Sequence, residues 1–487
     1  MIFQKQKKGA LLVLVLVFGA IFFIITSSYI GYIITQHQTQ QSKYNSERAL
    51  GIAEAGIDYY KWYLAHFPDD TTNGTGVPGP YVIPYTDPET AAIGEFSLEI
   101  ASTTYCGDVA SINITSTGYT YDDPDQMRTI YAKYARPTVA EYSYIINANV
   151  WAGPDRVILG PYYSNGHIRM DGTNNSTVSS GQASWVCDGS YSCSPDGSTV
   201  SAVFGDGPNF ALWEFPSPPI NFTGLLVDLA SMLDRAQNGG GIYIPPSGNF
   251  GYRVDFQSDG TVDIYVVDSV DSYGAAKSGA PPYIEFNVID SDFFLVTHTI
   301  DPNCPLIFVE DKVWLEGEVS TKVSLAVADV DSPGVDPSIV LNGNITYTST
   351  TSGLLAIAEE DVSVGLVVPD DMGLNGIFIA QNGQFGRNYY CPFWRCTWWW
   401  NDGTGWKYQY MYMPPSLRSY AKRNSLTING TIVSNGSVGT QWGSGDGYSS
   451  GFEFRVNSYD RDLVDNPPPL APKTSDDYKF VDWREVR

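Results

Sequence analysis

Basic residues are scarce in this 487-residue chain, which has 28 Lys and Arg against 53 Asp and Glu and a formal net charge of −25. An excess of negative charge on this scale repels nucleic-acid backbones and anionic membrane surfaces, so nucleic acid is not expected as a partner. Histidine is rarer still, and the four residues form no spaced motif: His37, His66, His167 and His298. The chain also lacks a P-loop, a dinucleotide fingerprint and a serine nucleophile elbow. These absences argue against the common cofactor-dependent and nucleophilic enzymes.

Cysteines are few and are not arranged for metal binding. None of the six forms two CxxC pairs or a Cys/His set, so neither a zinc site nor any cofactor is expected. Two pairs bracket short polar loops and can form local disulfides, Cys187 with Cys193 and Cys391 with Cys396. Cys106 and Cys304 are far apart and fall in different predicted units, so their spacing gives no reason to pair them. Disulfides are permitted outside the cytoplasm.

Charge is absent altogether from residues 10–42, which follow three lysines: Lys5, Lys7 and Lys8. The positive end should stay in the cytoplasm while the rest crosses outward. A secretory signal has an apolar core of about 7 to 15 residues and a small-residue cleavage site. Here the apolar run continues through Ile33 and Ile34, which is long enough to span a bilayer. The sequence therefore predicts a single-pass membrane protein with a cytoplasmic N-terminus and an extracytoplasmic bulk, in contact with inner-membrane lipid.

The helical pattern does not stop where the apolar run ends. Apolar residues recur at Ile52, Gly56, Tyr59 and Tyr63, with no proline before Pro68. This spacing predicts one continuous helix over residues 10–66. Its first half suits lipid, and its second half should pack on a domain through Tyr59, Trp62 and Tyr63.

Three features of this region resemble type IV pilin-like proteins: the short leader ending KKG at residues 7–9, the uncharged helix, and AEAGI at residues 53–57. They are similar to the amino-terminal region of PilX-type minor pilins and of K-type minor pseudopilins. The resemblance implies a leader over residues 1–9, cleaved by a prepilin peptidase between Gly9 and Ala10, with the helix retained. It also implies other pilins or pseudopilins as partners.

One position departs from that family. Most major pilins carry Glu at the fifth mature position, where this chain has Leu14. Because an unpaired buried charge is costly, a subunit without this Glu is not expected at a general internal place in a filament. K-type pseudopilins share the absence, which implies a place at the filament tip. The alternative is a plain single-pass anchor with no filament role.

The remainder predicts a mainly β fold. Alternating segments over residues 67–137 predict a small pilin-like β platform packed on the helix, giving an α+β unit. Residues 138–456 repeat a short motif of Asn-Gly or Glu-Gly followed by alternation: SNGHIRM from Ser164, LEGEVST from Leu315, LNGNITY from Leu341, LNGIFIA from Leu374, INGTIVS from Ile428 and SNGSVGT from Ser434. Internal similarity of this kind favours a parallel β-solenoid. The alternative is a β-sandwich with Asn-Gly hairpins.

Two breaks in the repeat predict insertions, at about residues 221–300 and 387–422. The first should begin with an amphipathic helix from Asn221 and continue into a strand pair that turns at Asp259 and Gly260. A C-terminal tail over residues 457–487 follows the last coil. Its end is expected to run back along the solenoid as a strand, with Trp483 packed on it.

Aromatic residues crowd into the second insertion: Phe393, Trp394, Trp398, Trp399, Trp400, Trp406, Tyr408, Tyr410 and Tyr412. As a disulfide-pinned hairpin they could stack on sugar rings or dock a protein. The structural alternative is a hairpin lying against the solenoid with every second ring buried.

Together these features predict a non-enzymatic, pilin-like surface protein that contributes to pilus assembly or displays a β-solenoid at a filament tip for adhesion. Its partners would be other pilins, the peptidase, and surface glycans or proteins. One competing class is an anchored adhesin or carbohydrate-binding protein outside any pilus. Another is a polysaccharide-active enzyme, which needs carboxylates clustered at a cleft.

Overall fold

The computed structural model describes residues 8–67, 70–87, 91–187, 189–225, 227–331, 334–443, 449–475 and 477–486. Residues 1–7 of the predicted leader lie outside this range, as does Pro68. The chain divides into two compact units. Unit 1 comprises Met1–Ser102, Ser111–Ala135 and Phe480–Arg487, and unit 2 comprises Thr103–Ala110 and Arg136–Lys479. The fold class predicted from sequence is confirmed: the chain is mainly β, with 47% of its residues in strands after a long N-terminal helix.

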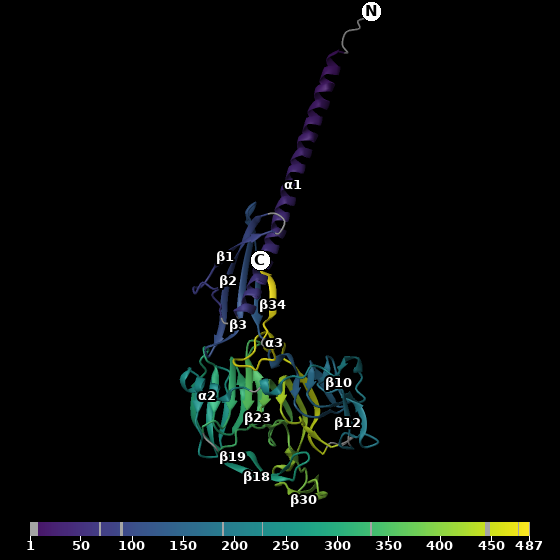
Figure 1. The fold of residues 1–487 in the computed structure, drawn as a ribbon, viewed down its shortest axis with the longest axis vertical. Helices are drawn as coiled ribbons and strands as arrows, with labels where there is room; N and C mark the ends of the chain where they lie inside the picture. The colour runs from purple at the N-terminus through teal and green to yellow at the C-terminus, as the bar shows by residue number, and fades with distance from the viewer. Residues whose placement is uncertain are drawn as a thin grey trace, which may run out of the picture. The chain divides into compact units, whose positions relative to one another are not determined.

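That helix, α1, runs without interruption over Lys8–His66, as the sequence predicts (Figure 1). Its two halves differ in burial. Large apolar side chains from Leu11 to Ile34 are all exposed, whereas the second half buries one face that includes Ile52, Tyr60 and Leu64. The buried face recurs every three or four residues, which is the spacing of a helix packed on one side. One helix thus carries a free apolar segment and a packed segment.

The packed half of α1 lies on a five-stranded sheet in the order β1-β2-β3-β4-β34. The strands are β1 (Tyr81–Thr86), β2 (Ala92–Tyr105), β3 (Asp108–Thr120), β4 (Asp123–Ala135) and β34 (Lys479–Val486). Side chains of β2 and β3 alternate between buried and exposed, because one face of the sheet meets the helix. The last strand, β34, joins this sheet in unit 1, and Trp483 is exposed. The expectation that the C-terminal end runs along the solenoid was therefore wrong.

Small residues set the distance between α1 and the sheet. A Cβ atom on Gly56 would lie 2.3 Å from Ser116 Oγ and 2.9 Å from Phe96 Cδ2. On the sheet, a Cβ atom on Gly118 would lie 2.4 Å from the Ala49 carbonyl oxygen. The small residues of the AEAGI segment therefore have a structural role. Ala53 and Gly56 are buried and let the helix backbone approach the strands.

Not every predicted contact on this face forms. Tyr63 is buried, and the Tyr59 ring lies 5.9 Å from that of Phe96. Trp62 instead is 55% exposed, so its predicted packing on the sheet is wrong. Trp62 points away because the helix turns about 100° per residue, and the close approach at Gly56 fixes which face meets the sheet.

Unit 2 is built on a stack of parallel strands. Its longest row pairs in parallel throughout, in the order β16 (Ile242–Ile244), β20 (Leu306–Val309), β22 (Lys322–Val327), β24 (Gly353–Ala358), β26 (Asp371–Ala380), β31 (Lys422–Ser434), β5 (Tyr144–Ile146), β8 (Tyr162–Ser164), β11 (Val178–Ser180) and β15 (Trp213–Glu214). Successive turns of the chain thus lie side by side.

Shorter parallel rows form the other sides of the coils. One pairs β17 (Tyr252–Phe256), β21 (Val313–Val319), β23 (Ile339–Tyr347), β25 (Val362–Val364) and β27 (Phe385–Gly386). Another pairs β31 with β33 (Ser450–Ser458), β7 (Arg156–Leu159) and β10 (Thr173–Asn174), and a third pairs β6 (Val150–Ala152), β9 (Ile168–Met170) and β14 (Val203–Phe204). The Asn-Gly pairs at 342–343, 375–376 and 429–430 lie inside parallel strands. They do not form the hairpins that a β-sandwich would need.

The coils do not follow one another in chain order. The coils begin at β5, in the middle of the long row, and proceed to β15 at one end. The chain then crosses to β16 at the opposite end through α2 (Leu229–Asn238) and returns to the middle at β31 and β33. The last coil consequently pairs with the first, β31 with β5 and β33 with β7.

Several central strands are buried on both faces. In β20, Ile307 and Val309 join the core inside the coils, whereas Leu306 and Phe308 face a second core that includes Met232 and Leu233 of α2. Two-sided burial explains why such strands are continuous apolar runs instead of alternating ones. The helix α2 begins at Leu229, with Asp228 as its N-cap, later than the predicted start at Asn221.

The insertions form antiparallel additions to this stack. In the first, β18 (Thr261–Ala276) pairs with β17 and with β19 (Tyr283–Thr299). The second contains the isolated hairpin of β29 (Arg395–Asn401) and β30 (Trp406–Tyr412). Smaller additions are the β12–β13 hairpin (Ser184–Cys187 and Ser198–Ser201), β28 (Tyr389–Tyr390), β32 (Gln441–Trp442) and α3 (Arg461–Asp465).

All six cysteines are paired. Cys187 is bonded to Cys193 and Cys391 to Cys396, the two local pairs that the spacing suggested. The third disulfide joins Cys106 to Cys304, across 198 residues of sequence. Cysteine spacing could not predict this pair, because it depends on the tip of the β2–β3 hairpin belonging to unit 2.

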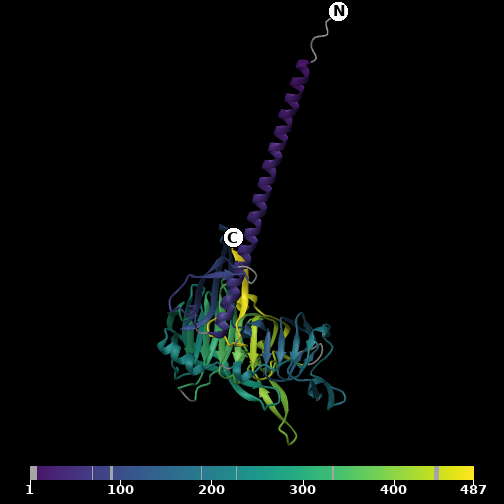
Figure 2. The same cartoon turned by 45° about the horizontal axis from the view of Figure 1, so that its top comes forward.

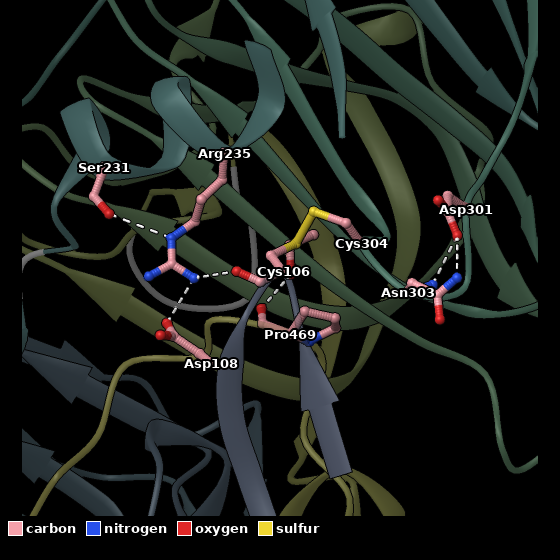
Figure 3. The surroundings of a disulfide bond; sticks show 9 residues. Cys106, Asp108, Ser231, Arg235, Asp301, Asn303, Cys304 and Pro469 are labelled. Carbon is pink, nitrogen blue, oxygen red and sulfur yellow. Dashed lines mark hydrogen bonds and ion pairs between the residues drawn. A yellow bond between two sulfur atoms is a disulfide. The ribbon is translucent and has the colours of Figure 1, made fainter. Parts of the chain in front are cut away.

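Polar contacts surround this third disulfide (Figure 3). The Cys106 backbone N–H donates to the Asn303 carbonyl, with the two atoms 2.9 Å apart. Arg235 of α2 donates from Nη1 to the Cys106 carbonyl at 2.8 Å and pairs with Asp108 at 2.9 Å. The hairpin tip is thus held by one covalent bond, backbone hydrogen bonding and one ion pair.

Candidate functional site

The first half of α1 and the β29–β30 hairpin each expose apolar side chains on a scale that suggests function. In α1, exposed residues such as Leu11, Phe22 and Ile34 belong to the segment without charged side chains. Within the described part of the chain, α1 is the one helix that is long and apolar enough to cross a bilayer. Its length and composition are consistent with a membrane anchor.

The residues of the predicted cleavage site lie at the start of this helix. Gly9 and Ala10 fall in the first turn of α1, which begins at Lys8. Leu14 follows one turn later, and its side chain is 56% exposed. An apolar side chain at this position needs no polar partner in an apolar environment, whereas a carboxylate would need one.

The β29–β30 hairpin projects from the rest of unit 2 (Figures 1 and 2). It exposes most of the aromatic residues that the sequence singled out. The exposed rings are Phe393, Trp394, Trp399, Trp406, Tyr408, Tyr410 and Tyr412, with exposed fractions from 42% to 71%. Trp398 and Trp400 are half-buried. The expectation that every second ring would be buried was wrong, since the hairpin forms a two-stranded sheet of its own.

One face of the hairpin holds it to the rest of unit 2. The Trp398 ring lies 5.0 Å from the ring of Tyr389 and 5.7 Å from that of Trp442, and its Nε1–H donates to the Ala280 carbonyl at 2.9 Å. Met411 is buried on this side, and the bond from Cys391 to Cys396 closes the base of the hairpin. These contacts fix the hairpin's orientation.

The opposite face forms a group of aromatic rings around one cation. The rings of Trp399 and Tyr408 are 4.9 Å apart, and those of Tyr408 and Tyr410 are 6.0 Å apart. The Arg395 guanidinium lies 4.4 Å from the centre of the Tyr410 ring. Sequence analysis did not single out Arg395. The signal was present in its position between Trp394 and a run of three tryptophans.

Unit 2 also contains a groove of about 990 Å³ beside the segment that crosses from β15 to α2. Hydroxyl side chains of serine, threonine and tyrosine residues line much of it, together with Glu141 and Glu214. Burial raises the pKa of the Glu141 carboxyl above its ordinary value. The two carboxylates give this groove polar groups that would suit a polar ligand.

The side chain of His167 is packed within unit 2. Its ring stacks on that of Trp185 at 4.8 Å, and burial lowers its pKa. Among the residues that the structure describes, no group of three or more His, Cys, Asp or Glu side chains is placed to bind a metal ion.

No protein-family model and no curated protein matches this chain. Among solved structures, it is similar to the crystal structure of the competence-associated pilin ComZ from Thermus thermophilus. The sequences are 13% identical, the match covers 91% of this chain and 97% of the other, and the TM-score is 0.32. Because a TM-score this low does not establish a common fold, the function is argued from this chain's own residues.

Proposed function

We propose that this chain is a pilin-like subunit of the minor pilin or minor pseudopilin kind. A prepilin peptidase trims it between Gly9 and Ala10, and its apolar helix segment stays in the membrane or the filament. Unit 2 is displayed outside the cell. The chain acts by assembly and contact, not by turnover of a substrate.

The observation that supports this proposal best is the division of α1. A single helix exposes its uncharged first half and packs its second half on a β sheet through Ala53 and Gly56. A signal sequence that is removed would have no reason to continue into the core of a folded unit. An exposed apolar helix of this length needs lipid or other apolar helices around it.

Leu14 supports a place at the end of a filament. The new N-terminus after Gly9 carries a positive charge, and inside an apolar filament core this charge needs a carboxylate partner. Leu14 cannot supply one to a neighbouring subunit. A subunit at the tip has neighbours on only one side, so its lack of Glu costs the least there.

The competing function is an anchored adhesin outside any pilus. The exposed aromatic face of the hairpin favours a contact role in either case, because it is held open by its own anchoring contacts. What separates the two functions is therefore the helix and its processing.

Filament association tests the proposal. The chain with its native leader, a Gly9→Val variant and a Gly373→Ala control are expressed in the source cell, and surface filaments are sheared off and collected. Gly373 lies in unit 2, outside α1, and a Cβ atom there meets no atom within 4 Å, so this control leaves the fold and the apolar helix intact. We expect the wild type and the control in the filament fraction, and Gly9→Val only in the membrane fraction.

The distribution of the wild type decides the outcome. If it stays with the membrane fraction while filaments are made normally, the pilin-like function is contradicted and the anchored adhesin is favoured. If Gly9→Val enters filaments as well as the wild type, cleavage after Gly9 is not required, and that part of the proposal fails.

A further inference from the structure

The β29–β30 hairpin has two chemically different faces. In the strand register, Arg395 lies opposite Tyr412, Thr397 opposite Tyr410, and Trp399 opposite Tyr408. Residues that oppose one another project on the same side, and sides alternate along each strand. Asn401 lies opposite Trp406 on the same side, so this face carries four cross-strand pairs made of aromatic rings and polar side chains, and no aliphatic side chain. The only large flexible apolar residue within the paired strands, Met411, is on the anchored face.

The exposed rings suit a ligand that has both C–H and hydroxyl groups. Aromatic rings are electron-rich on their faces and attract the slightly positive C–H edges of a flat ligand. Trp399, Tyr408 and Tyr410 offer such faces beside polar groups of Thr397 and Asn401, all of them exposed. Sugar rings combine these two properties, whereas an acyl chain would gain nothing from the polar groups.

Arg395 adds a positive charge that is held in place. Its guanidinium lies 4.4 Å from the Tyr410 ring centre and 5.8 Å from that of Trp394. It forms no salt bridge with any of the residues that the structure describes. The two rings restrict its rotamers, so little conformational entropy is lost when it binds a ligand. A guanidinium of this kind matches the two oxygens of a carboxylate.

The charge around the hairpin differs from that of the whole chain. Residues 387–423 contain six basic residues and one acidic residue, although acidic residues outnumber basic ones 53 to 28 overall. The basic residues are Arg387, Arg395, Lys407, Arg418, Lys422 and Arg423, and the acidic one is Asp402. This segment therefore repels an anionic partner less than the chain as a whole does, although Arg387 is buried and Lys407 and Arg423 are paired with Asp402 and Asp370.

We propose that the exposed face of the β29–β30 hairpin binds an acidic polysaccharide, with a sugar ring on Trp399 and Tyr408 and its carboxylate on Arg395. This inference rests on the proposed display of unit 2 outside the cell, where such polymers occur. The inference specifies which class of ligand the displayed hairpin binds.

Binding of polygalacturonate by the purified full-length chain in detergent tests this inference. The methyl ester of the same polymer is the matched ligand without charge. We expect the ester to bind about tenfold more weakly, since it cannot accept the bidentate hydrogen bonds of Arg395. Trp399→Ala and Arg395→Gln should each raise the Kd about tenfold, by loss of stacking and of charge respectively. Gln409→Ala, on the anchored face of the same hairpin, should bind like the wild type.

Circular dichroism and the melting temperature establish that each variant is folded. Equal affinity for the polymer and its ester, unchanged affinity in both Trp399→Ala and Arg395→Gln, or no binding of polygalacturonate would each overturn the inference. Tighter binding of single-stranded poly-dT than of polygalacturonate would also overturn it, since rings with basic residues suit nucleic acid as well. None of these results depends on leader cleavage or filament entry, so they leave the proposed function standing.

Discussion

Replacing both Cys106 and Cys304 with serine is expected to lower the free energy of unfolding by up to about 5 kcal/mol. The disulfide closes a loop of 198 residues, so its loss frees a large part of the unfolded chain. In the folded chain, Arg235 and Asn303 still hold the hairpin tip by hydrogen bonds. Urea unfolding of the full-length chain in detergent, followed by far-ultraviolet circular dichroism, measures the change.

The disulfide between Cys187 and Cys193, also in unit 2, supplies the matched control. Cys187 and Cys193 are only 6 residues apart, so the same double replacement there should cost about 2 kcal/mol. If the two double variants lose the same stability, loop length is not the origin of the effect. If Cys106→Ser/Cys304→Ser unfolds like the wild type, the disulfide adds nothing to the contacts around it.

Replacing Gly430 with alanine is expected to destabilise the chain by at least about 3 kcal/mol. Gly430 of β31 is stacked on Gly376 of β26 in register, and both have positive φ, +146° and +150°. A Cβ atom on Gly430 would lie 1.8 Å from the Gly376 carbonyl oxygen, so one of the two coils would have to shift. The same unfolding experiment measures the loss as a lower urea midpoint.

Gly373 is the control for this substitution because it lies in the same strand row. A Cβ atom there meets nothing within 4 Å, so Gly373→Ala should change stability by no more than about 0.5 kcal/mol. Equal effects of the two substitutions would show that the general preference for alanine over glycine decides the result. The predicted clash between a Cβ atom on Gly430 and the Gly376 carbonyl would then not be the cause of the lost stability.

Local patterns in the sequence were enough to predict α1 and the repeating strands. The prediction of the helix rests on the spacing of apolar residues over a few turns. Ala53 and Gly56 could also be recognised as small residues on its packed face. The Asn-Gly repeats also marked real structural positions, because Gly376 and Gly430 occupy the same place in successive coils. Such features follow from neighbours in the sequence, which is what periodicity can detect.

Contacts between distant segments could not be predicted in this way. The pairing of Cys106 with Cys304, the pairing of β31 with β5, and the place of β34 beside β4 all join residues far apart in sequence. Each depends on the path of the whole chain. No local spacing records that the last coil of unit 2 returns to the first.

For the β29–β30 hairpin, the sequence predicted which residues are involved but not which of them are exposed. Its composition identified the aromatic residues, but burial depends on which face meets the rest of unit 2. Trp398 became the anchor, while Trp399 beside it became exposed. Net charge over the whole chain also concealed the opposite charge balance of residues 387–423. The burial of each ring and the charge near the hairpin both depend on local surroundings, which the composition of the whole chain does not describe.

The mature N-terminus of the protein from its source cell is the most direct measurement of the central claim. Mass spectrometry of the intact chain, or N-terminal sequencing, should find a chain that starts at Ala10 and keeps all of the apolar segment of α1. A chain that starts at Met1 would contradict trimming by a prepilin peptidase. A chain that starts beyond residue 34 would contradict the retained helix itself.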